Sequence, residues 1–216
     1  MLKLYSYWRS SASYRVRIAL HLKGLEFQTL PVHIARGGDE QHGETYRALN
    51  PQKRVPLLID GDFKLNQSQA ILDYLESRFP QPPLLPTDAR LQARVRAFCM
   101  TIVADVQPLQ NSGLLSYLED VLQIEAPERQ AWARYWITRG LTALDAELHD
   151  EAETPFVFGD SPTWADCILV PQVYAARRFG CDLADFARLV RVADRCMALP
   201  AFMRAHPDAQ PDAQPA

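Results

Sequence analysis

Four prolines fall within the seven residues from Pro80 to Pro86, and this segment is the strongest constraint on how the chain can fold. A proline lacks the backbone N–H and clashes with the preceding helical turn, so the segment fits neither a helix nor an interior strand. We therefore expect a linker at residues 81–87, between a domain at residues 1–80 and a second domain at 88–208, with a flexible tail at 209–216. A length of 216 residues accommodates two domains of ordinary size.

Before the linker, short apolar runs alternate with helical patterns. The runs typical of strands lie at residues 2–5, 27–32, 55–59 and 63–65, and the helical patterns lie at 11–23 and 67–78. Asp60-Gly61 favours a hairpin turn between the last two runs. This order predicts a strand–helix–strand unit followed by a hairpin and a helix, as in thioredoxin, although periodicity alone also fits other small α/β folds.

After the linker, strand signals nearly vanish and helical periodicity dominates. Two apolar helical faces are formed by Val95, Phe98, Ile102, Val106 and Leu109, and by Trp132, Trp136, Leu141, Leu144 and Leu148. Thr163 and Asp166 fit a capping box, in which each side chain satisfies a backbone N–H at a helix start. The second domain is therefore predicted to be all-helical, and the fold class is α/β plus all-α.

From Pro207 onward the tail repeats Pro-Asp-Ala-Gln with almost nothing apolar to bury, so we expect it to be mobile and without chemistry.

Two adjacent serines, Ser10 and Ser11, stand where the first apolar run turns into the first helical pattern. The first N–H groups of a helix lack intrahelical partners, and the aligned peptide dipoles leave partial positive charge there, so this position can stabilise a thiolate or a carboxylate. On this motif alone a plain N-cap is the commoner role for either serine, because serine is a preferred capping residue.

Charge and composition argue against several classes of function. The net charge is −3 and the 23 basic residues form no long run, which disfavours a nucleic-acid or membrane-surface role. No apolar stretch reaches the roughly 18 residues of a membrane helix, and the N-terminus enters a strand at once in place of a signal peptide, so we expect a cytoplasmic protein. The cysteines are widely spaced and no zinc, redox or phosphate-loop motif occurs, so no metal is expected.

Two further segments add to the serine pair. Residues 50–61 place Val-Pro before a strand and Asp-Gly after it, and residues 66–75 begin a helix with Gln-Ser. Taken with Ser-Ser-x-x-x-Arg-Val-Arg-Ile-Ala-Leu in the first helix, the chain resembles the zeta class of glutathione transferases, whose best-known members are maleylacetoacetate isomerases. The resemblance runs from Leu2 to about Pro207 and implies a thioredoxin-like glutathione-binding domain followed by an all-helical domain.

The resemblance implies a glutathione site with a separate device for each part of the tripeptide. Ser68 would receive the γ-glutamyl carboxylate at a helix start, Gln41 the glycyl carboxylate, and Val55 the cysteinyl part beside a cis Pro56. Without the resemblance, Ser68 is an N-cap, Gln41 a solvated loop residue, and a trans bond before Pro56 is more frequent. The implied glutathione contacts are Ser10, Ser11, Ala12, Ser13, Tyr14, Arg15, Gln41, Val55, Pro56, Gln67, Ser68, Gln107 and Asn111.

Within this set, Ser11, with Ser10 beside it, would hold the glutathione sulfur. A hydroxyl donor and the helix dipole both lower the pKa of a thiol, which raises the thiolate population at neutral pH. In the family the serine pair is commonly followed by Cys, whereas this chain has Ala12. The change removes a second thiol from the site, so we expect isomerase activity to survive, and reactions that depend on that Cys are put in question.

The second substrate of such an isomerase is a dicarboxylate, which needs cations. Arg9 precedes the serines, and Arg178 lies in the last turn of the helix that begins at Thr163, at the position of the family's substrate-binding arginine. Planar guanidinium groups bind carboxylates through paired hydrogen bonds, so both are candidate anchors. Compensation of the helix dipole is the plain alternative, and it is our interpretation of Arg177.

Two amides complete the implied cleft. Gln107 and Asn111 are four residues apart in a Gln-Pro-Leu-Gln-Asn motif, on one side of a helix that Pro108 should kink. A mid-helix glutamine is usually only solvated, so these two rest on the resemblance. In the first helix, Arg15 occupies a family contact position, whereas we expect Arg17 to be structural.

The activity implied by the resemblance is glutathione-dependent cis–trans isomerisation of a maleyl keto acid by reversible thiolate addition, with maleylacetoacetate as the expected substrate. Maleylpyruvate isomerase and a zeta-class transferase acting on small α-halo acids are the alternatives of similar chemistry. A non-catalytic glutathione-fold binding module is the alternative of another class, and the joint presence of Ser11, Pro56, Gln67, Ser68 and Arg178 argues against it. The resemblance also implies a homodimer.

Overall fold

The structure, a computed structural model, describes residues 1–35, 37–149 and 152–214. Its contacts divide the chain into a first unit, Met1–Leu84 with Met197–Ala216, and a second unit, Leu85–Cys196. The first unit is thus built from both ends of the sequence. This division differs from the expected boundaries, which assigned residues through 208 to the helical domain and the remainder to a free tail.

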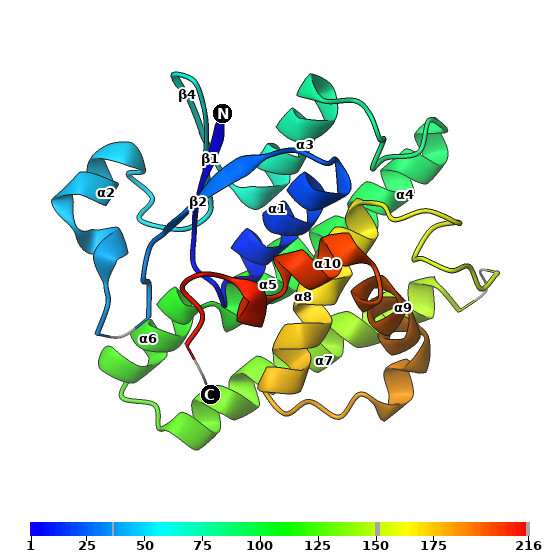
Figure 1. The fold of residues 1–216 in the computed structure, drawn as a ribbon. Coiled ribbons are helices and arrows are strands. Elements are labelled where there is room, and N and C mark those ends of the chain that lie inside the picture. The colour runs from blue at the N-terminus through cyan, green and yellow to red at the C-terminus, as the bar shows by residue number, and fades with distance from the viewer. Residues whose placement is uncertain (36, 150–151, 215–216) are drawn as a thin grey trace. The chain divides into compact units, whose positions relative to one another are not determined.

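The first unit contains a four-stranded mixed sheet in the order β2-β1-β3-β4 (Figure 1). Strand β1 (Leu2–Ser6) pairs in parallel with β2 (Phe27–Pro31) and antiparallel with β3 (Leu57–Asp60), and β3 pairs antiparallel with β4 (Phe63–Asn66). Parallel strands need a crossover, which a helix supplies between β1 and β2, whereas β3 and β4 are joined by the tight turn at Gly61 (φ +63°). The thioredoxin-like arrangement expected from the sequence is confirmed.

The helices of the first unit pack around that crossover. Helix α1 (Ser11–Leu22) contacts both α3 (Ser68–Arg78) and α10 (Pro200–Ala205), while α2 (Glu44–Leu49) follows a short 3-10 turn, η1, at Glu40–His42. The fully buried apolar side chains of this unit include Leu4, Val16, Ile18, Leu20, Ile71, Leu72, Leu75 and Phe202. Because α10 buries its apolar side chains against α1, the end of the chain belongs to this unit.

A buried lysine fastens the proline-rich segment to the first unit. Lys23 Nζ lies 2.9 Å from the Glu76 carboxylate on α3 and donates hydrogen bonds to the carbonyl oxygens of Phe79 (2.8 Å) and Pro82 (3.0 Å). The Glu76 carboxylate in turn accepts a hydrogen bond from the Leu84 N–H at 3.0 Å. A buried ammonium group needs such partners because it has lost its hydration. The segment expected to be a linker is therefore bonded to the first unit as far as Leu84.

In the described part of the second unit the regular structure is helical apart from one β-bridge, between Phe156 and Gly159. Its α-helices are α4 (Ala89–Met100), α5 (Gln107–Gln110), α6 (Ser112–Asp120), α7 (Ala126–Glu147), α8 (Trp164–Arg178) and α9 (Ala187–Met197). An all-helical second domain is thereby confirmed.

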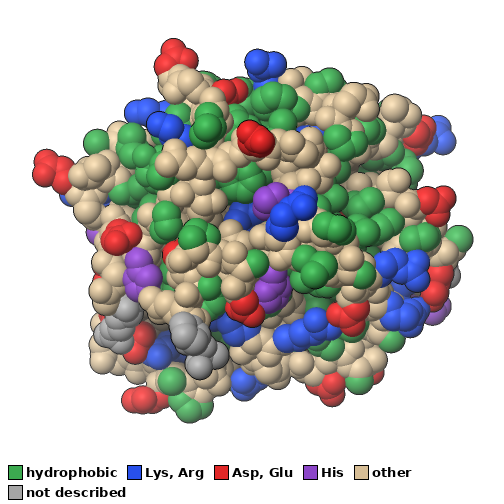
Figure 2. Space-filling view, in the orientation of Figure 1, with side chains coloured by type: hydrophobic (Ala, Val, Ile, Leu, Met, Phe, Trp, Pro, Cys, Tyr) green, Lys and Arg blue, Asp and Glu red, His purple; other side chains and the backbone are tan. Residues whose placement is uncertain are grey.

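Across the described residues, every helix is too short or too polar to cross a membrane. On the face drawn in Figure 2, acidic and basic side chains are interspersed.

A π-helical segment, Thr101–Val106, separates α4 from α5, and the backbone N–H of Gln107 bonds to the carbonyl oxygen of Ile102, five residues back. Pro108 supplies the physical reason, because it lacks an N–H and its ring would clash with the carbonyl four residues earlier in a regular α-helix. Helix α5 ends at Gln110, and Asn111 is extended (φ −73°, ψ 158°). The expectation that Gln107 and Asn111 share one kinked helix is therefore wrong.

The capping box predicted at the start of α8 is present. The Thr163 hydroxyl accepts a hydrogen bond from the Ala165 N–H (3.2 Å), and the Asp166 carboxylate accepts one from the Thr163 N–H (2.8 Å). The same carboxylate also accepts a hydrogen bond from the Val157 N–H at 2.9 Å, which joins the preceding loop to the helix. Burial raises the pKa of Asp166 to about 6, because desolvation disfavours the charged form more than these hydrogen bonds favour it.

This pKa predicts a specific pH dependence of stability. An acid whose pKa rises from an ordinary 3.8 to about 6 on folding stabilises the fold at low pH and loses that contribution as pH rises through 6. The difference in unfolding free energy between the unsubstituted chain and Asp166→Asn should therefore shrink by about 2 kcal/mol between pH 4.5 and 7. Urea denaturation of both proteins at several pH values measures it, and a difference that stays constant or grows with pH contradicts the prediction.

Candidate functional site

The two serines occupy different positions in the turn from β1 into α1. Ser10 is the N-cap of α1, and its hydroxyl accepts a hydrogen bond from the Ser13 N–H at 3.2 Å. Ser11 is the first helical residue and is half-buried. Its hydroxyl has no hydrogen-bond partner within the described part of the chain, and it lies at the positive end of the helix dipole. Ser11 is therefore the serine whose hydroxyl is available to an anionic ligand.

The residues that follow Ser11 differ in how accessible they are. Ala12 is half-buried, whereas Ser13, Tyr14 and Arg15 are 0%, 1% and 1% exposed. The Tyr14 hydroxyl donates to Met197 Sδ at 3.3 Å, within the first unit. The side chains of Ser13 and Tyr14 are thus part of the packing of α1, and of these four positions Ala12 alone is open to solvent.

Arg15 links α1 to the start of α3. Its guanidinium donates a hydrogen bond from Nη1 to Ser68 Oγ at 3.2 Å, and both side chains are buried. Ser68 is the first residue of α3, after Gln67 in a left-handed conformation (φ +66°), which an L-residue adopts rarely. Gln67 itself is exposed and donates from Nε2 to Gln52 Oε1 at 2.8 Å. The cation and the helix dipole together make this helix start favourable for a carboxylate.

The peptide bond between Val55 and Pro56 is cis, as the family resemblance predicts, and a second cis bond joins Gln81 and Pro82. The backbone before Pro56 is fixed by two hydrogen bonds to the Arg54 carbonyl, from the Tyr46 hydroxyl and from the Asn50 amide, each 2.7 Å long.

One apolar cluster joins this loop to the serine turn. The cluster consists of Tyr7, Trp8, Val32, Tyr46, Val55 and Leu57. It contains Trp8, two residues before Ser10, and Val55, directly before Pro56. The structure therefore packs the segments that carry Ser11 and Pro56 against one shared core.

Gln41 is buried, whereas its neighbour His42 is exposed. In η1, Gln41 Nε2 has a long hydrogen bond of 3.5 Å to the Ile34 carbonyl, and Gln41 Oε1 has no partner in the described residues. The plain alternative for Gln41, a solvated loop residue, does not fit this burial, whereas it fits His42. Arg9, half-buried, stacks its guanidinium on the Trp8 ring at 5.2 Å from the ring centre.

In the second unit the Asn111 side chain caps α6. Its Oδ1 accepts a hydrogen bond from the Leu114 N–H (2.9 Å), and its Nδ2 donates to the Pro108 carbonyl (2.8 Å), which leaves one N–H of the amide for another partner. Gln107 is the first residue of α5 and is half-buried. The second glutamine of the motif, Gln110, is buried and donates to Gln172 at 2.8 Å.

Arg178 ends α8 with an exposed side chain, whose guanidinium stacks on Phe179 at 4.4 Å from the ring centre. The adjacent Arg177 forms an exposed ion pair with Asp194 at 2.8 Å, so it has a local partner besides the helix end. Arg17, expected to be structural, is fully buried with main-chain oxygens as acceptors.

Two family models match this chain. The N-terminal domain model of the glutathione S-transferases matches residues 1–77, and their C-terminal domain model matches residues 128–204. The chain is 48% identical to a maleylacetoacetate isomerase of Pseudomonas aeruginosa over 98% of each sequence.

Two solved structures are similar over nearly the whole chain. One is the holo structure of a maleylpyruvate isomerase, described as a bacterial glutathione S-transferase of the zeta class; its TM-score is 0.95 at 43% identity, covering 98% of this chain and 100% of that one. The other is a maleylacetoacetate isomerase of Anaeromyxobacter dehalogenans with dicarboxyethyl glutathione and citrate in its active site. Its TM-score is 0.87 at 45% identity, covering 100% of this chain and 94% of that one.

The cap geometry predicts that the two serines contribute unequally to stability. Ser10→Ala should lower the unfolding free energy by about 1 kcal/mol, because it removes the acceptor for the Ser13 N–H. Ser11→Ala should change it by less than about 0.5 kcal/mol, because alanine is a good helix former and no protein contact is lost. Urea denaturation of the two matched variants measures both values, and equal losses would show that the capping assignment is wrong.

Proposed function

This chain belongs to the zeta class of glutathione transferases, and we propose that it is a glutathione-dependent cis–trans isomerase of a maleyl keto acid, with maleylacetoacetate as the physiological substrate. The observation that carries the proposal is that the two serines at the start of α1 have different roles. Ser10 caps the helix, and the Ser11 hydroxyl is available to the ligand. When bound, glutathione supplies a thiolate that adds reversibly to the cis double bond, permits rotation and leaves unchanged.

Ser11 stabilises the thiolate form. Its hydroxyl donates a hydrogen bond to the sulfur, and the unpaired N–H groups of the first turn of α1 add positive potential. Both effects favour the charged form, so they lower the pKa of the thiol. Ala12, at the position where the family commonly has Cys, offers no competing thiol.

The buried polar groups of the first unit fit the rest of the tripeptide. Ser68 accepts its hydrogen bond from Arg15, so its own hydroxyl proton can be donated to the γ-glutamyl carboxylate at the N-terminus of α3, beside Gln67. The backbone of Val55, before the cis bond to Pro56, pairs with the cysteinyl part in the manner of an added strand. Gln41 has a buried amide whose Nε2 makes one long hydrogen bond, to the Ile34 carbonyl at 3.5 Å, so its second N–H can donate to the glycyl carboxylate.

Cations hold the second substrate. We assign Arg9 and Arg178 to its carboxylates, because a guanidinium group offers two parallel donors to a carboxylate and also stabilises the negative charge that develops during addition. The Gln107 amide and the remaining N–H of Asn111 add neutral donors. The proposal for these four residues rests on the positions that they occupy in the family.

The first experiment is an absorbance assay of the purified protein with maleylacetoacetate and with maleylpyruvate, with and without glutathione. Glutathione-dependent loss of maleylacetoacetate is the expected result, and Ser11→Ala should lower the rate by about 100-fold or more, because one donor to the developing charge is lost. Ser10→Ala, which perturbs only the cap, should retain most of the activity. Selective loss of maleylpyruvate would identify the isomerase named in the similar holo structure. Turnover of neither acid, with glutathione still bound, would favour a transferase for small α-halo acids or a binding module.

The position of Arg178 predicts a defect in substrate binding. Arg178→Ala should raise the KM for the keto acid by about tenfold or more, because a guanidinium–carboxylate contact contributes roughly 1.5–3 kcal/mol. Arg178→Lys keeps the charge without the paired donors, so its KM should fall between those of the unsubstituted protein and Arg178→Ala. Arg177→Ala is the matched control, since that neighbour is already paired with Asp194. An unchanged KM in Arg178→Ala would place the carboxylate anchor elsewhere.

We also propose, from the family membership, a cytoplasmic homodimer. Gel filtration with light scattering should return about twice the chain mass of 24.5 kDa, and a monomer at assay concentrations would refute the dimer.

A further inference from the structure

The C-terminal segment, Met197–Gln214, is held by specific contacts in place of the mobility that its composition suggested. It contains α10 and a short 3-10 turn, Pro207–Ala209, and it packs within the first unit. Its last described residues also reach the segments proposed to bind glutathione. Asp212, in the Pro-Asp-Ala-Gln repeat, makes the most direct of these contacts.

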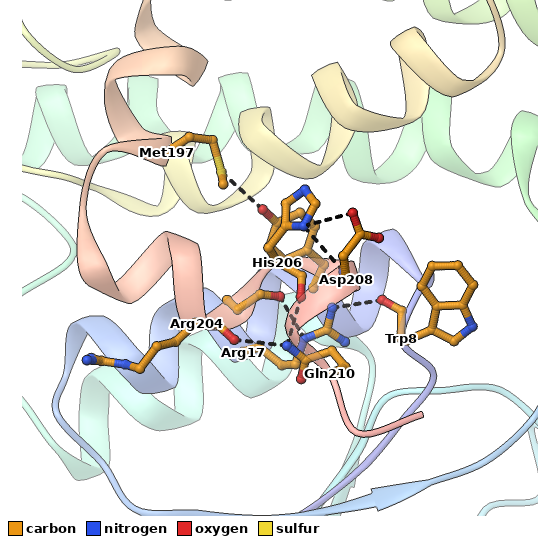
Figure 3. Close-up of polar contacts among 9 residues, drawn as sticks. Trp8, Arg17, Met197, Arg204, His206, Asp208 and Gln210 are labelled. Carbon is orange, nitrogen blue, oxygen red and sulfur yellow. Dashed lines mark hydrogen bonds and ion pairs between the residues drawn. The ribbon is translucent and has the colours of Figure 1, made fainter. Parts of the chain in front are cut away.

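Asp212 and Arg17 together fix the peptide groups on both sides of Trp8. The Trp8 N–H donates to Asp212 Oδ2 at 2.9 Å, and the Trp8 carbonyl accepts from Arg17 Nη2 at 2.9 Å. In Figure 3 the Arg17 guanidinium lies between Trp8 and the C-terminal segment that carries Arg204 and Gln210. A hydrogen bond from a backbone N–H to a carboxylate is charge-assisted and stronger than a neutral one.

The path from these contacts to Ser11 is short. Arg17 also donates from Nε to the Ala205 carbonyl (3.0 Å) and from Nη1 to the Tyr7 carbonyl (3.4 Å). The same Tyr7 carbonyl accepts a hydrogen bond from the Ser10 N–H at 3.0 Å. Through the Arg17 side chain, the backbone immediately before Ser11 is therefore linked to the C-terminal segment.

The segment also supports the other glutathione-binding loop. Ala213, next to Asp212, packs against the apolar cluster that contains Tyr7, Trp8 and Val55. Ala213 thus packs on the apolar cluster that the segments carrying Ser11 and Pro56 share.

We propose that Asp212 is a positioning residue of the glutathione site, an inference that rests on the function proposed above. By holding the Trp8 N–H, it sets the path of the β1–α1 turn and so the place of the Ser11 hydroxyl and of the first N–H groups of α1. Catalytic donors lose effect steeply when they are displaced by about 1 Å, so a relaxed turn weakens thiolate stabilisation without any loss of a group that touches the ligand. Asp212 itself has no contact with substrate in this role.

A positioning role and a charge role of Asp212 predict opposite shifts in the pKa of the bound thiol, so the two roles can be told apart. If Asp212 acted through its negative charge, it would oppose thiolate formation, and Ala or Asn would lower the pKa of the bound thiol equally. If it acts through position, Asp212→Ala raises that pKa, whereas Asp212→Asn retains an acceptor oxygen for Trp8 and stays close to the unsubstituted protein.

The experiment is a pH titration of the ultraviolet absorbance of the bound glutathione thiolate, together with the Kd for glutathione and the Tm of each variant. Asp212→Ala should raise the pKa of the bound thiol by about 0.5–1 and weaken glutathione binding about fivefold, with Asp212→Asn within about twofold of the unsubstituted protein. Asp208→Ala is the matched control, because this exposed carboxylate of the same segment pairs only with His206 among the described residues. If Asp212→Ala does not fold, Asp212→Ser, whose side chain is too short to reach Trp8, replaces it.

The outcomes are distinguishable. A thiol pKa and a Kd in Asp212→Ala equal to those of the unsubstituted protein would overturn the positioning role, and so would a lowered pKa shared by Ala and Asn. A lowered Tm with unchanged thiol pKa would reduce Asp212 to a structural residue. Absence of any thiolate signal or glutathione binding in the unsubstituted protein would instead refute the proposed function.

Discussion

The first unit depends on the solvation of one buried cation. Arg17 is 0% exposed, and a guanidinium group that is removed from water must have every strong donor direction satisfied by the protein. Its acceptors are the Ser6 hydroxyl and the main-chain oxygens of Tyr7, Trp8 and Ala205, and its guanidinium also stacks on Tyr14. None of these oxygens can move far without leaving a buried charge unpaired. The end of β1, the turn and α10 are therefore fixed relative to α1.

Arg15, two residues earlier in the same helix, is a second buried cation. Residues two apart in a helix point in different directions, so Arg17 bonds to the C-terminal segment while Arg15 bonds to Ser68 at the start of α3. Helix α1 thus carries two buried cations, each directed at a different segment of the site. Packing alone would hold α1 less specifically, since apolar contacts tolerate small shifts that hydrogen-bonded ions do not.

Features that depend on local chemistry could be predicted from the sequence. The strand runs, the capping box at Thr163 and the helix starts at Ser11 and Ser68 are local signals, and the structure contains each of them. The cis bond before Pro56 came from the family resemblance, because dipeptide chemistry alone favours trans.

The features that could not be predicted depend on distant partners. The C-terminal tail has almost no apolar residues, so composition indicated mobility, yet the Asp212 carboxylate and Ala213 hold it against Trp8 and its cluster, from more than 200 residues away in sequence. The burial of Gln41 likewise follows from tertiary packing, which the polar sequence of its loop does not record.

The bonds of Lys23 and Glu76 limit the changes in length that the proline-rich segment can tolerate, both in evolution and in engineering. A spacer tolerates changes in length, because its residues have no fixed partners. Here an insertion or deletion between Phe79 and Leu84 would pull a carbonyl or an N–H away from a buried ion, whereas the same change after Leu84 leaves those bonds intact. The boundary at which a foreign domain could be joined to the first unit is therefore Leu84, four residues later than the first proline suggests.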